Sequence, residues 1–253
     1  MPPVLPVTSN DAAVLPPIAS RAEFEEQMTA LRDQEKELTR HSDAVAAARR
    51  RLPMVPIDST LQLIGPAGPV TLLDAFEGRR QLIAYYHMWH EGRPAGEQCQ
   101  GCTWNNSQVA ERSYLHSRDI TFAVLCQGPY DESSRYRDFM GWDMPWYSAQ
   151  PSLDTLLSGR QIGRMHIVCY VRQGEDVYET YWTTGRGVEV QDLSYSLMDL
   201  TTWGRQEEGE DSPPGWPQHW PVDGTHICTD GRPTPQWSRI EAGYSDDLTG
   251  SRR

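Results

Sequence analysis

Two cysteines three residues apart are the residues of this chain best suited to chemistry. Cys99 and Cys102 lie in the sequence EQCQGC, between an apolar stretch and a predicted helix. The free N–H groups at a helix N-terminus favour negative charge, so we expect the Cys99 thiol to ionise below the ordinary cysteine pKa of about 8.5. Cys99 would then attack a disulfide, and Cys102 would resolve the mixed disulfide.

The same spacing is also half of a tetrahedral zinc site. His87 and His90 come just before the pair. They could complete a Cys2His2 set, or donate hydrogen bonds to a Cys99 thiolate. Two inert buried thiols are the third interpretation, although the glycine and polar neighbours argue against burial. The pattern favours a redox dithiol without a cofactor, assigns no metal ligand, and leaves a metal ion open as the alternative.

Composition narrows the partners and the compartment. The 253 residues include 35 acidic and 23 basic side chains, and the resulting net charge of -12 argues against a nucleic-acid partner. No window approaches the ~20 apolar residues of a membrane span, and the proline-rich start does not resemble a signal peptide. Cys126, Cys169 and Cys228 show no pairing pattern. We therefore expect a cytoplasmic protein that binds neither nucleic acid nor membrane.

The elements around the cysteines predict where the pair lies. Residues 81–86, QLIAYY, are typical of a buried central strand, and residues 120–126, ITFAVLC, of a second one. A helix is predicted over residues 103–117, between the two strands. This order predicts a parallel pair with a right-handed crossover, which puts the cysteines at the carboxyl end of a strand.

The remaining pattern completes an α/β fold. A helix is predicted over residues 131–140, a hairpin over residues 167–182, and an amphipathic helix near residues 190–200. This order is that of the thioredoxin fold. We therefore predict a thioredoxin-like fold of three layers, with a mixed central sheet and helices on both faces.

Aromatic residues follow the predicted helix over residues 131–140. Trp142, Trp146 and Tyr147 could wall a substrate groove beside the thiols. Core packing is the commoner role of such residues, and we favour it.

The N-terminal part predicts a long helix with one apolar stripe. Ser20 and Glu23 form a capping box, and the helix should end before Pro53. The apolar positions recur at near-heptad spacing, interrupted by Glu35. The stripe could pack on the chain's own body or on a second subunit of a homodimer, and periodicity does not separate these. Its members are Phe24, Met28, Leu31, Leu38 and Val45.

Four segments follow from these patterns. Residues 1–19 are predicted to be a disordered leader, residues 20–52 the N-terminal helix, and residues 53–203 the thioredoxin-like domain. Residues 204–253 are rich in Pro, Gly and acidic side chains, so we expect a tail that lies over the surface or is disordered.

Several motifs are shared with a known family. They are EKELTR at 35–40, RRRLPMV at 49–55, QLI at 81–83, the Cys99 pair, MGW and PW within 140–146, and LT and GR within 200–205. Over roughly residues 35–205 the sequence resembles the thioredoxin-like family called domain of unknown function 899, generally labelled predicted dithiol-disulfide oxidoreductases. The resemblance implies thiol chemistry on a disulfide or thiol substrate, protein or small molecule. Gly92 and Gly96 occupy the positions where a peroxiredoxin carries proline and threonine, so a peroxidase is not implied.

Three functions remain open from the sequence. The first is a thiol-disulfide oxidoreductase that uses Cys99 and Cys102. The second is a metal-binding protein with a Cys/His site on a thioredoxin-like frame. The third is a binding module that acts through its N-terminal helix while the thiols are idle.

Overall fold

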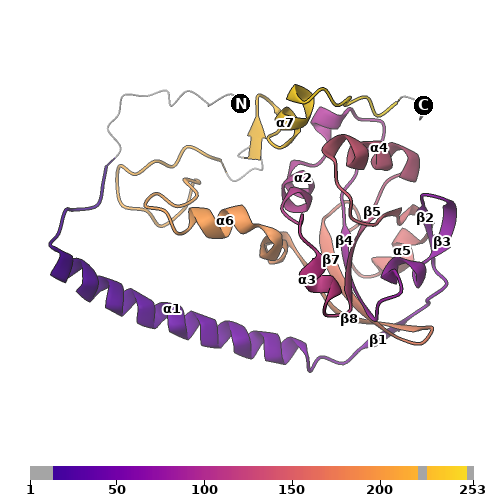
Figure 1. Cartoon of the computed structure of the whole chain (residues 1–253), viewed down its shortest axis with the longest axis horizontal. Coiled ribbons are helices and arrows are strands. Elements are labelled where there is room, and N and C mark those ends of the chain that lie inside the picture. The colour runs from indigo at the N-terminus through magenta and orange to yellow at the C-terminus, as the bar shows by residue number, and fades with distance from the viewer. Residues whose placement is uncertain (1–13, 222–226, 250–253) are drawn as a thin grey trace.

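The computed structural model describes residues 14–221 and 227–249, whose course Figure 1 traces. Within these residues the chain forms a mixed α/β structure with one eight-stranded sheet, one two-stranded sheet and helices. The predicted α/β class with a mixed sheet is confirmed. Residues 1–13 of the predicted leader lie outside the described residues.

The eight-stranded sheet carries the cysteine pair at the end of a central strand. Its strands lie in the order β1-β8-β7-β4-β5-β6-β2-β3 among the described residues. Strands β4, β5 and β6 are parallel, as predicted for β4 and β5, and the other pairings are antiparallel. The bounds are β1 Val55–Ile57, β2 Gln62–Gly65, β3 Gly68–Thr71, β4 Gln81–Tyr86, β5 Ile120–Cys126, β6 Trp146–Ser148, β7 His166–Gln173 and β8 Asp176–Thr184.

Helices and short 3-10 segments (η) connect the strands. Their bounds are α1 Arg21–Arg49, η1 Asp74–Phe76, η2 Ala95–Glu97, α2 Gln100–Ser107, α3 Ser113–His116, α4 Tyr130–Met140, η3 Gln150–Ser152, α5 Leu153–Leu156, η4 Gly185–Gln191, α6 Leu193–Met198 and α7 Gln236–Glu241. The helix predicted over residues 103–117 is instead two helices, α2 and α3. The Arg112 guanidinium donates to the carbonyls of Val109 and Ala110 at 3.1 and 3.0 Å, so a side chain satisfies carbonyls that a continuous helix would use.

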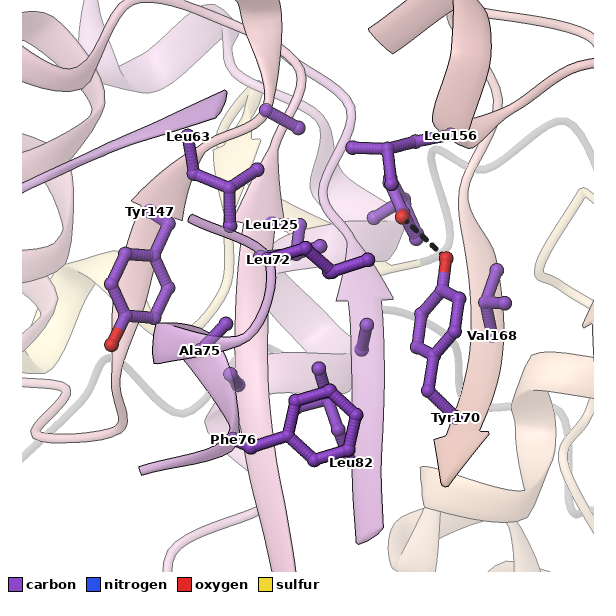
Figure 2. Packing of buried hydrophobic residues seen from close by; sticks show 14 of the residues in the cluster. Leu63, Leu72, Ala75, Phe76, Leu82, Leu125, Tyr147, Leu156, Val168 and Tyr170 are labelled. Carbon is purple, nitrogen blue, oxygen red and sulfur yellow. Dashed lines mark hydrogen bonds between the residues drawn. The ribbon is translucent and has the colours of Figure 1, made fainter. Parts of the chain in front are cut away.

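One side of the sheet is a dense core that we call the aliphatic face. Leu82, Ala84 and Tyr86, alternate residues of β4, point into it, and η1 and α5 cover it. Figure 2 shows this packing around Phe76, Leu125 and Tyr170. The buried members are Leu63, Leu72, Ala75, Phe76, Leu82, Ala84, Tyr86, Ala123, Leu125, Tyr147, Ala149, Leu156, Leu157, Val168, Tyr170 and Val177.

The other side of the sheet, which we call the thiol face, holds both candidate cysteines. Tyr85 of β4 points into it, and α2, α4 and η4 contribute Cys102, Tyr130 and Val188. Helical segments therefore cover both sides of the sheet. The buried members are Tyr85, Cys99, Cys102, Phe122, Val124, Cys126, Tyr130, Met144, Trp146, Ile167 and Val188.

The long N-terminal helix is confirmed. Ser20 and Glu23 form the predicted capping box, and α1 ends at Arg49. None of its side chains is buried, and Figure 1 shows it running apart from the sheet. Among the described residues, no helix combines the length and the apolar character that a membrane crossing requires.

Part of the predicted C-terminal tail is folded. Strands β9 (Cys228–Thr229) and β10 (Arg232–Pro233) form a hairpin, and α7 follows. The turn uses Asp230 and Gly231 with φ of 50° and 73°, the Asp-Gly chemistry of a tight hairpin. Strands of two residues are too short to give an alternating pattern, which explains why composition alone predicts a tail here.

Candidate functional site

Cys99 sits at the N-terminus of α2, where the sequence predicts it. It is the N-cap residue, and its Sγ accepts a hydrogen bond from the Cys102 N–H at 3.4 Å. The residue is 6 % exposed, so only a small part of it is open to a reagent. The helix start therefore directs an N–H donor and the positive end of its dipole at the thiol that the sequence marks as nucleophile.

Cys102 lies one helical turn deeper and is fully buried. Its Sγ accepts a hydrogen bond from the Met88 N–H at 3.2 Å, and the Met88 Sδ lies 3.7 Å from the Cys99 Sγ. The buried Tyr85 hydroxyl is beside Cys102, outside normal hydrogen-bond geometry. The loop after β4 thus supplies contacts to both sulfurs.

The two thiols differ in acidity. Hydrogen bonding from the Cys102 side chain lowers the pKa of Cys99, burial opposes this, and the Cys102 N–H and His90 add to the lowering. Burial raises the pKa of Cys102 well above the ordinary thiol value. Cys99 therefore ionises first, and Cys102 keeps its proton.

His87 does not join the cysteines. It is fully buried, and its Nδ1 accepts from the Asn106 amide at 2.8 Å, while Nε2 has no partner among the described residues. Burial, with a smaller effect of His90, lowers the pKa of His87 to about 3, so its ring is neutral. Aromatic rings surround it at centroid distances of 5.2 to 6.3 Å: Tyr85, Trp89, Tyr136, Trp142 and Trp146.

His90 also has a local partner. Its ring Nδ1 lies 2.9 Å from the Glu97 carbonyl oxygen, and its backbone N–H donates to the Gln98 Oε1 at 3.1 Å. In the part of the chain that the structure describes, no three His, Cys, Asp or Glu side chains are grouped so as to hold a metal ion. The Cys2His2 arrangement that the spacing allows is therefore not assembled by these residues.

The aromatic residues after α4 are core residues. Trp146 is buried on the thiol face, stacks with Trp142 at a centroid distance of 5.8 Å, and donates to the Ser133 hydroxyl at 3.1 Å. Tyr147 points to the aliphatic face. The core interpretation is confirmed for Trp146 and Tyr147, whereas Trp142 is half-buried against the thiol face. None of the three lines the cleft that lies beside Cys99.

A different set of residues forms a cleft beside Cys99. The cleft has a volume of about 660 Å³, and its walls come from α2, the loop before β7, η4 and α6. Met165 lies directly against the start of α2, because a Cβ on Gly101 would be 3.3 Å from the Met165 Cε. Trp104, Arg164 and Asp192 add an indole, a cation and a carboxyl group. None of these residues is close to the cysteines in the sequence except Trp104.

Asp192 is the titratable group that the sequence analysis missed. It is 4 % exposed, and its Oδ1 accepts from the Gln108 amide at 3.4 Å. Burial, assisted by the nearby Glu189, raises the pKa of Asp192 to about 7. Asp192 precedes α6 but caps it with no side-chain hydrogen bond. An Asp before a helix predicts a cap, so the sequence carries no signal for this role.

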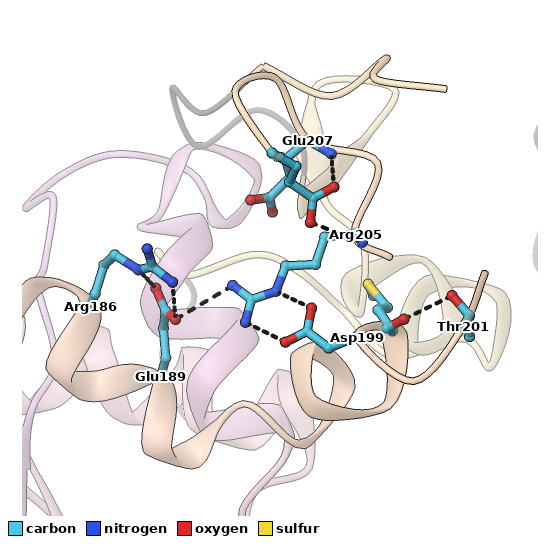
Figure 3. A network of polar contacts seen from close by, with 8 residues as sticks. Arg186, Glu189, Asp199, Thr201, Arg205 and Glu207 are labelled. Carbon is cyan, nitrogen blue, oxygen red and sulfur yellow. Dashed lines mark hydrogen bonds and ion pairs between the residues drawn. The ribbon is translucent and has the colours of Figure 1, made fainter. Parts of the chain in front are cut away.

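Ion pairs hold the cleft wall formed by η4 and α6. Figure 3 shows Arg205 between two carboxylates, with Glu189 at 3.4 Å and Asp199 at 2.8 Å. Arg186 pairs with the same Glu189 at 2.8 Å. The Asp199 and Glu189 carboxylates raise the pKa of Arg205. The network ties residue 205 to the segment that carries Asp192.

A hydrogen-bond chain joins α2 to the C-terminal segment. The Thr103 hydroxyl donates to the Cys99 carbonyl at 2.9 Å and contacts the Tyr136 hydroxyl at 2.6 Å. The buried Gln236 amide of α7 donates to the Tyr136 hydroxyl at 2.7 Å and to the Ala95 carbonyl at 2.8 Å. Hydrogen bonds through Tyr136 of α4 therefore connect the Cys99 backbone to α7.

Comparison with known proteins gives a family and no named relative. No curated protein matches the chain. A family described as bacterial protein of unknown function (DUF899) matches residues 13–223, which include the cysteine pair, Asp192 and Arg205. Because the match covers most of the chain, this protein belongs to the DUF899 family.

Proposed function

We propose that this protein is a thioredoxin-like thiol-disulfide oxidoreductase with Cys99 as the nucleophile and Cys102 as the resolving thiol. One observation carries the proposal. Cys99 caps α2 with a lowered pKa at the edge of a cleft, while Cys102, one turn later, is fully buried with a raised pKa. A dithiol enzyme needs this division, because one thiol must ionise before the other.

The order of elements supports the thioredoxin-like description. In that fold a parallel strand-helix-strand unit precedes an antiparallel hairpin and a closing helix, and the C-x-x-C opens the helix after the first core strand. Here β4, α2 and β5 are followed by the hairpin of β7 and β8 and then by α6. Met165 precedes the hairpin strand, where that fold carries a proline.

The proposed reaction is a two-electron exchange. The Cys99 thiolate attacks one sulfur of a substrate disulfide, forms a mixed disulfide, and releases the other substrate sulfur as a thiolate. Cys102 passes its proton to the substrate thiolate that departs first, attacks the Cys99 sulfur, and releases the second substrate thiolate. The substrate is reduced, the pair becomes a Cys99–Cys102 disulfide, and one external dithiol, or two molecules of a monothiol, returns the two electrons and is oxidised to a disulfide.

We assign Asp192 the exchange of protons in the cleft. With a pKa of about 7, its carboxyl group can protonate a departing thiolate and then recover a proton from solvent. Its neutral form also avoids repelling the Cys99 thiolate across the same cleft. Asp192 is thus the residue that would set the upper pH limit of the reaction.

Two features bear on substrate and compartment. A cleft of about 660 Å³ has the size of a small-molecule site. Because Cys99 is recessed, a disulfide with small groups around its sulfurs should reach it most easily. All five cysteines carry free thiols, which supports a reducing compartment such as the cytoplasm.

Thiol counting and turnover test this function. We expect two thiols to disappear when the reduced protein meets a small disulfide, and two to return with a dithiol reductant. Cys99→Ser should abolish this change, whereas Cys169→Ser, a partly buried thiol in β7, should leave it intact. A count that never changes by two, or stoichiometric metal that is lost in Cys99→Ser, would contradict the proposal. The reduction potential then gives the direction, with about -270 mV for a reductant and about -120 mV for an oxidant.

A further inference from the structure

Helix α1 exposes an apolar stripe that the rest of the described chain does not cover. Phe24, Leu31 and Leu38 are 48 %, 46 % and 66 % exposed, although α1 has 29 residues. Contact with the body includes the far end, where the Arg49 guanidinium lies 5.2 Å from the centre of the Tyr181 ring. A helix in water gains most of its stability from packing of an apolar face, so this stripe calls for a partner.

The spacing of the stripe points to another helix as the partner. Phe24, Leu31, Leu38 and Val45 follow one another at intervals of seven residues, and Met28 fills the adjoining position. Such a spacing gives a narrow seam along one side of a helix, the kind that packs against a single helix in a coiled coil. A helix that lies on a globular core shows a wider apolar face.

Length selects among the available helices. The stripe from Phe24 to Val45 extends about 32 Å at ~1.5 Å per residue. Helix α6 also exposes apolar side chains, with Leu193 62 % and Leu197 55 % exposed, but its six residues cover only part of the stripe. A second copy of α1 has the same length and the same seam.

Charge selects the orientation. Residues 21–37 of α1 carry six acidic and three basic side chains, whereas residues 38–49 carry one acidic and two basic side chains and are followed directly by Arg50 and Arg51. Two antiparallel helices place the acidic half of each against the basic half of the other, and two parallel helices place like charges together. We therefore propose that two copies of this chain associate through antiparallel pairing of α1 along Phe24, Leu31, Leu38 and Val45.

The molar mass of the full chain in solution tests the interface. By sedimentation we expect a dimer for the wild type, and for Leu31→Glu with Leu38→Glu a dissociation constant raised about 100-fold or more. The matched control is Ala30→Glu with Ala44→Glu, which adds the same two charges. Both positions are exposed, and each lies about 100° around the helix from the stripe residue that follows it, so the dimer should stay intact. A monomeric wild type, or a stripe variant that still dimerises, would overturn the proposal.

A strengthening variant covers the case in which the double glutamate harms α1 itself. Glu35 lies within the seam, between Leu31 and Leu38. Glu35→Leu should lower the dissociation constant at least about tenfold, because it continues the apolar seam at a position that favours a helix. A Glu35→Leu chain that associates no more tightly than the wild type would show that the seam is not the interface.

Salt dependence tests the orientation. Between about 50 mM and about 500 mM sodium chloride, the antiparallel arrangement should dissociate more easily as its opposite charges are screened. Parallel helices should associate more tightly instead, because their like charges are screened. A dissociation constant that is constant or falls with salt would therefore overturn the antiparallel arrangement. Neither readout depends on the thiols.

Discussion

The two faces of the sheet differ in how completely their buried polar groups are paired. On the aliphatic face, the Tyr86 and Tyr170 hydroxyls bond to each other at 2.8 Å, and Tyr147 donates to Glu77. On the thiol face, His87 Nε2 and Trp89 Nε1 are buried without a hydrogen-bond partner among the described residues. An unpaired buried polar atom costs roughly 1–3 kcal/mol of stability. We therefore interpret the aliphatic face as the part that stabilises the fold, and the thiol face as the part that keeps polar groups available for the proposed chemistry.

The largest effect should come from the reactive thiol itself. Cys99→Ser should reduce disulfide turnover by about 10³-fold or more, because the nucleophile of the proposed first step is lost. It should leave the free energy of unfolding within about 1 kcal/mol, because serine keeps an acceptor at the α2 cap. Urea unfolding and a turnover assay measure the two effects. A loss of turnover that comes with a loss of stability well above about 1 kcal/mol would mean that Cys99 has a structural role in this face.

The converse substitution lies on the aliphatic face. Leu125 is fully buried in β5, so Leu125→Ala should lower the free energy of unfolding by about 2–5 kcal/mol. The rate at which iodoacetamide alkylates Cys99 should stay within about twofold of the wild type, because no residue of the cleft is touched. A large change in that rate would show that the two faces are coupled.

Acid should weaken the protein through His87. The folded-state pKa of about 3 lies below the unfolded value, so between these values the unfolded chain binds the extra proton and stability falls as pH falls. From about pH 7 to about pH 5 this contribution amounts to about 2 kcal/mol. In His87→Phe that part of the slope should vanish, which unfolding curves at both pH values would reveal. An unchanged slope would mean that His87 is solvated or charged in the native state.

A matched pair of tyrosine substitutions gives the smallest and sharpest comparison. Tyr170→Phe leaves the buried Tyr86 hydroxyl without its partner and should lower the free energy of unfolding by about 1–2 kcal/mol. Tyr85→Phe removes a hydroxyl outside normal hydrogen-bond geometry and should change stability by less than about 0.5 kcal/mol. Equal stability losses in the two variants would remove the distinction between the faces.

Sequence patterns predicted the centre of the fold better than its edges. The apolar segments QLIAYY and ITFAVLC predicted β4 and β5, and their parallel pairing is confirmed. The edge strands β1 and β3 have three and four residues, and the internal strand β6 has three, so each is too short for a period to be read. The Arg112 contacts that separate α2 from α3 depend on one side chain, so no periodicity predicts them.

The candidate site likewise has residues that the sequence predicted and residues that it did not. Cys99 and Cys102 were predicted because local spacing and a helix start define them. Met165 reaches the cleft because the start of β7 pairs with the end of β4, and Asp192 because β8 returns the chain toward α2; such tertiary neighbours have no sequence signal. The hydrogen-bond partner of the buried His87 ring is likewise a tertiary neighbour, Asn106 of α2.

The contact between Gln236 and Tyr136 has a consequence for where this protein can be cut. The family match ends at residue 223, yet the Gln236 amide beyond that boundary is hydrogen-bonded to the residue that supports the first turn of α2. Leu248, also beyond the boundary, is buried against the same part of the molecule. A fragment trimmed to the family boundaries would therefore expose an apolar patch on α4 and loosen the start of α2. The folded structure around the candidate site therefore includes residues beyond the region that matches the family.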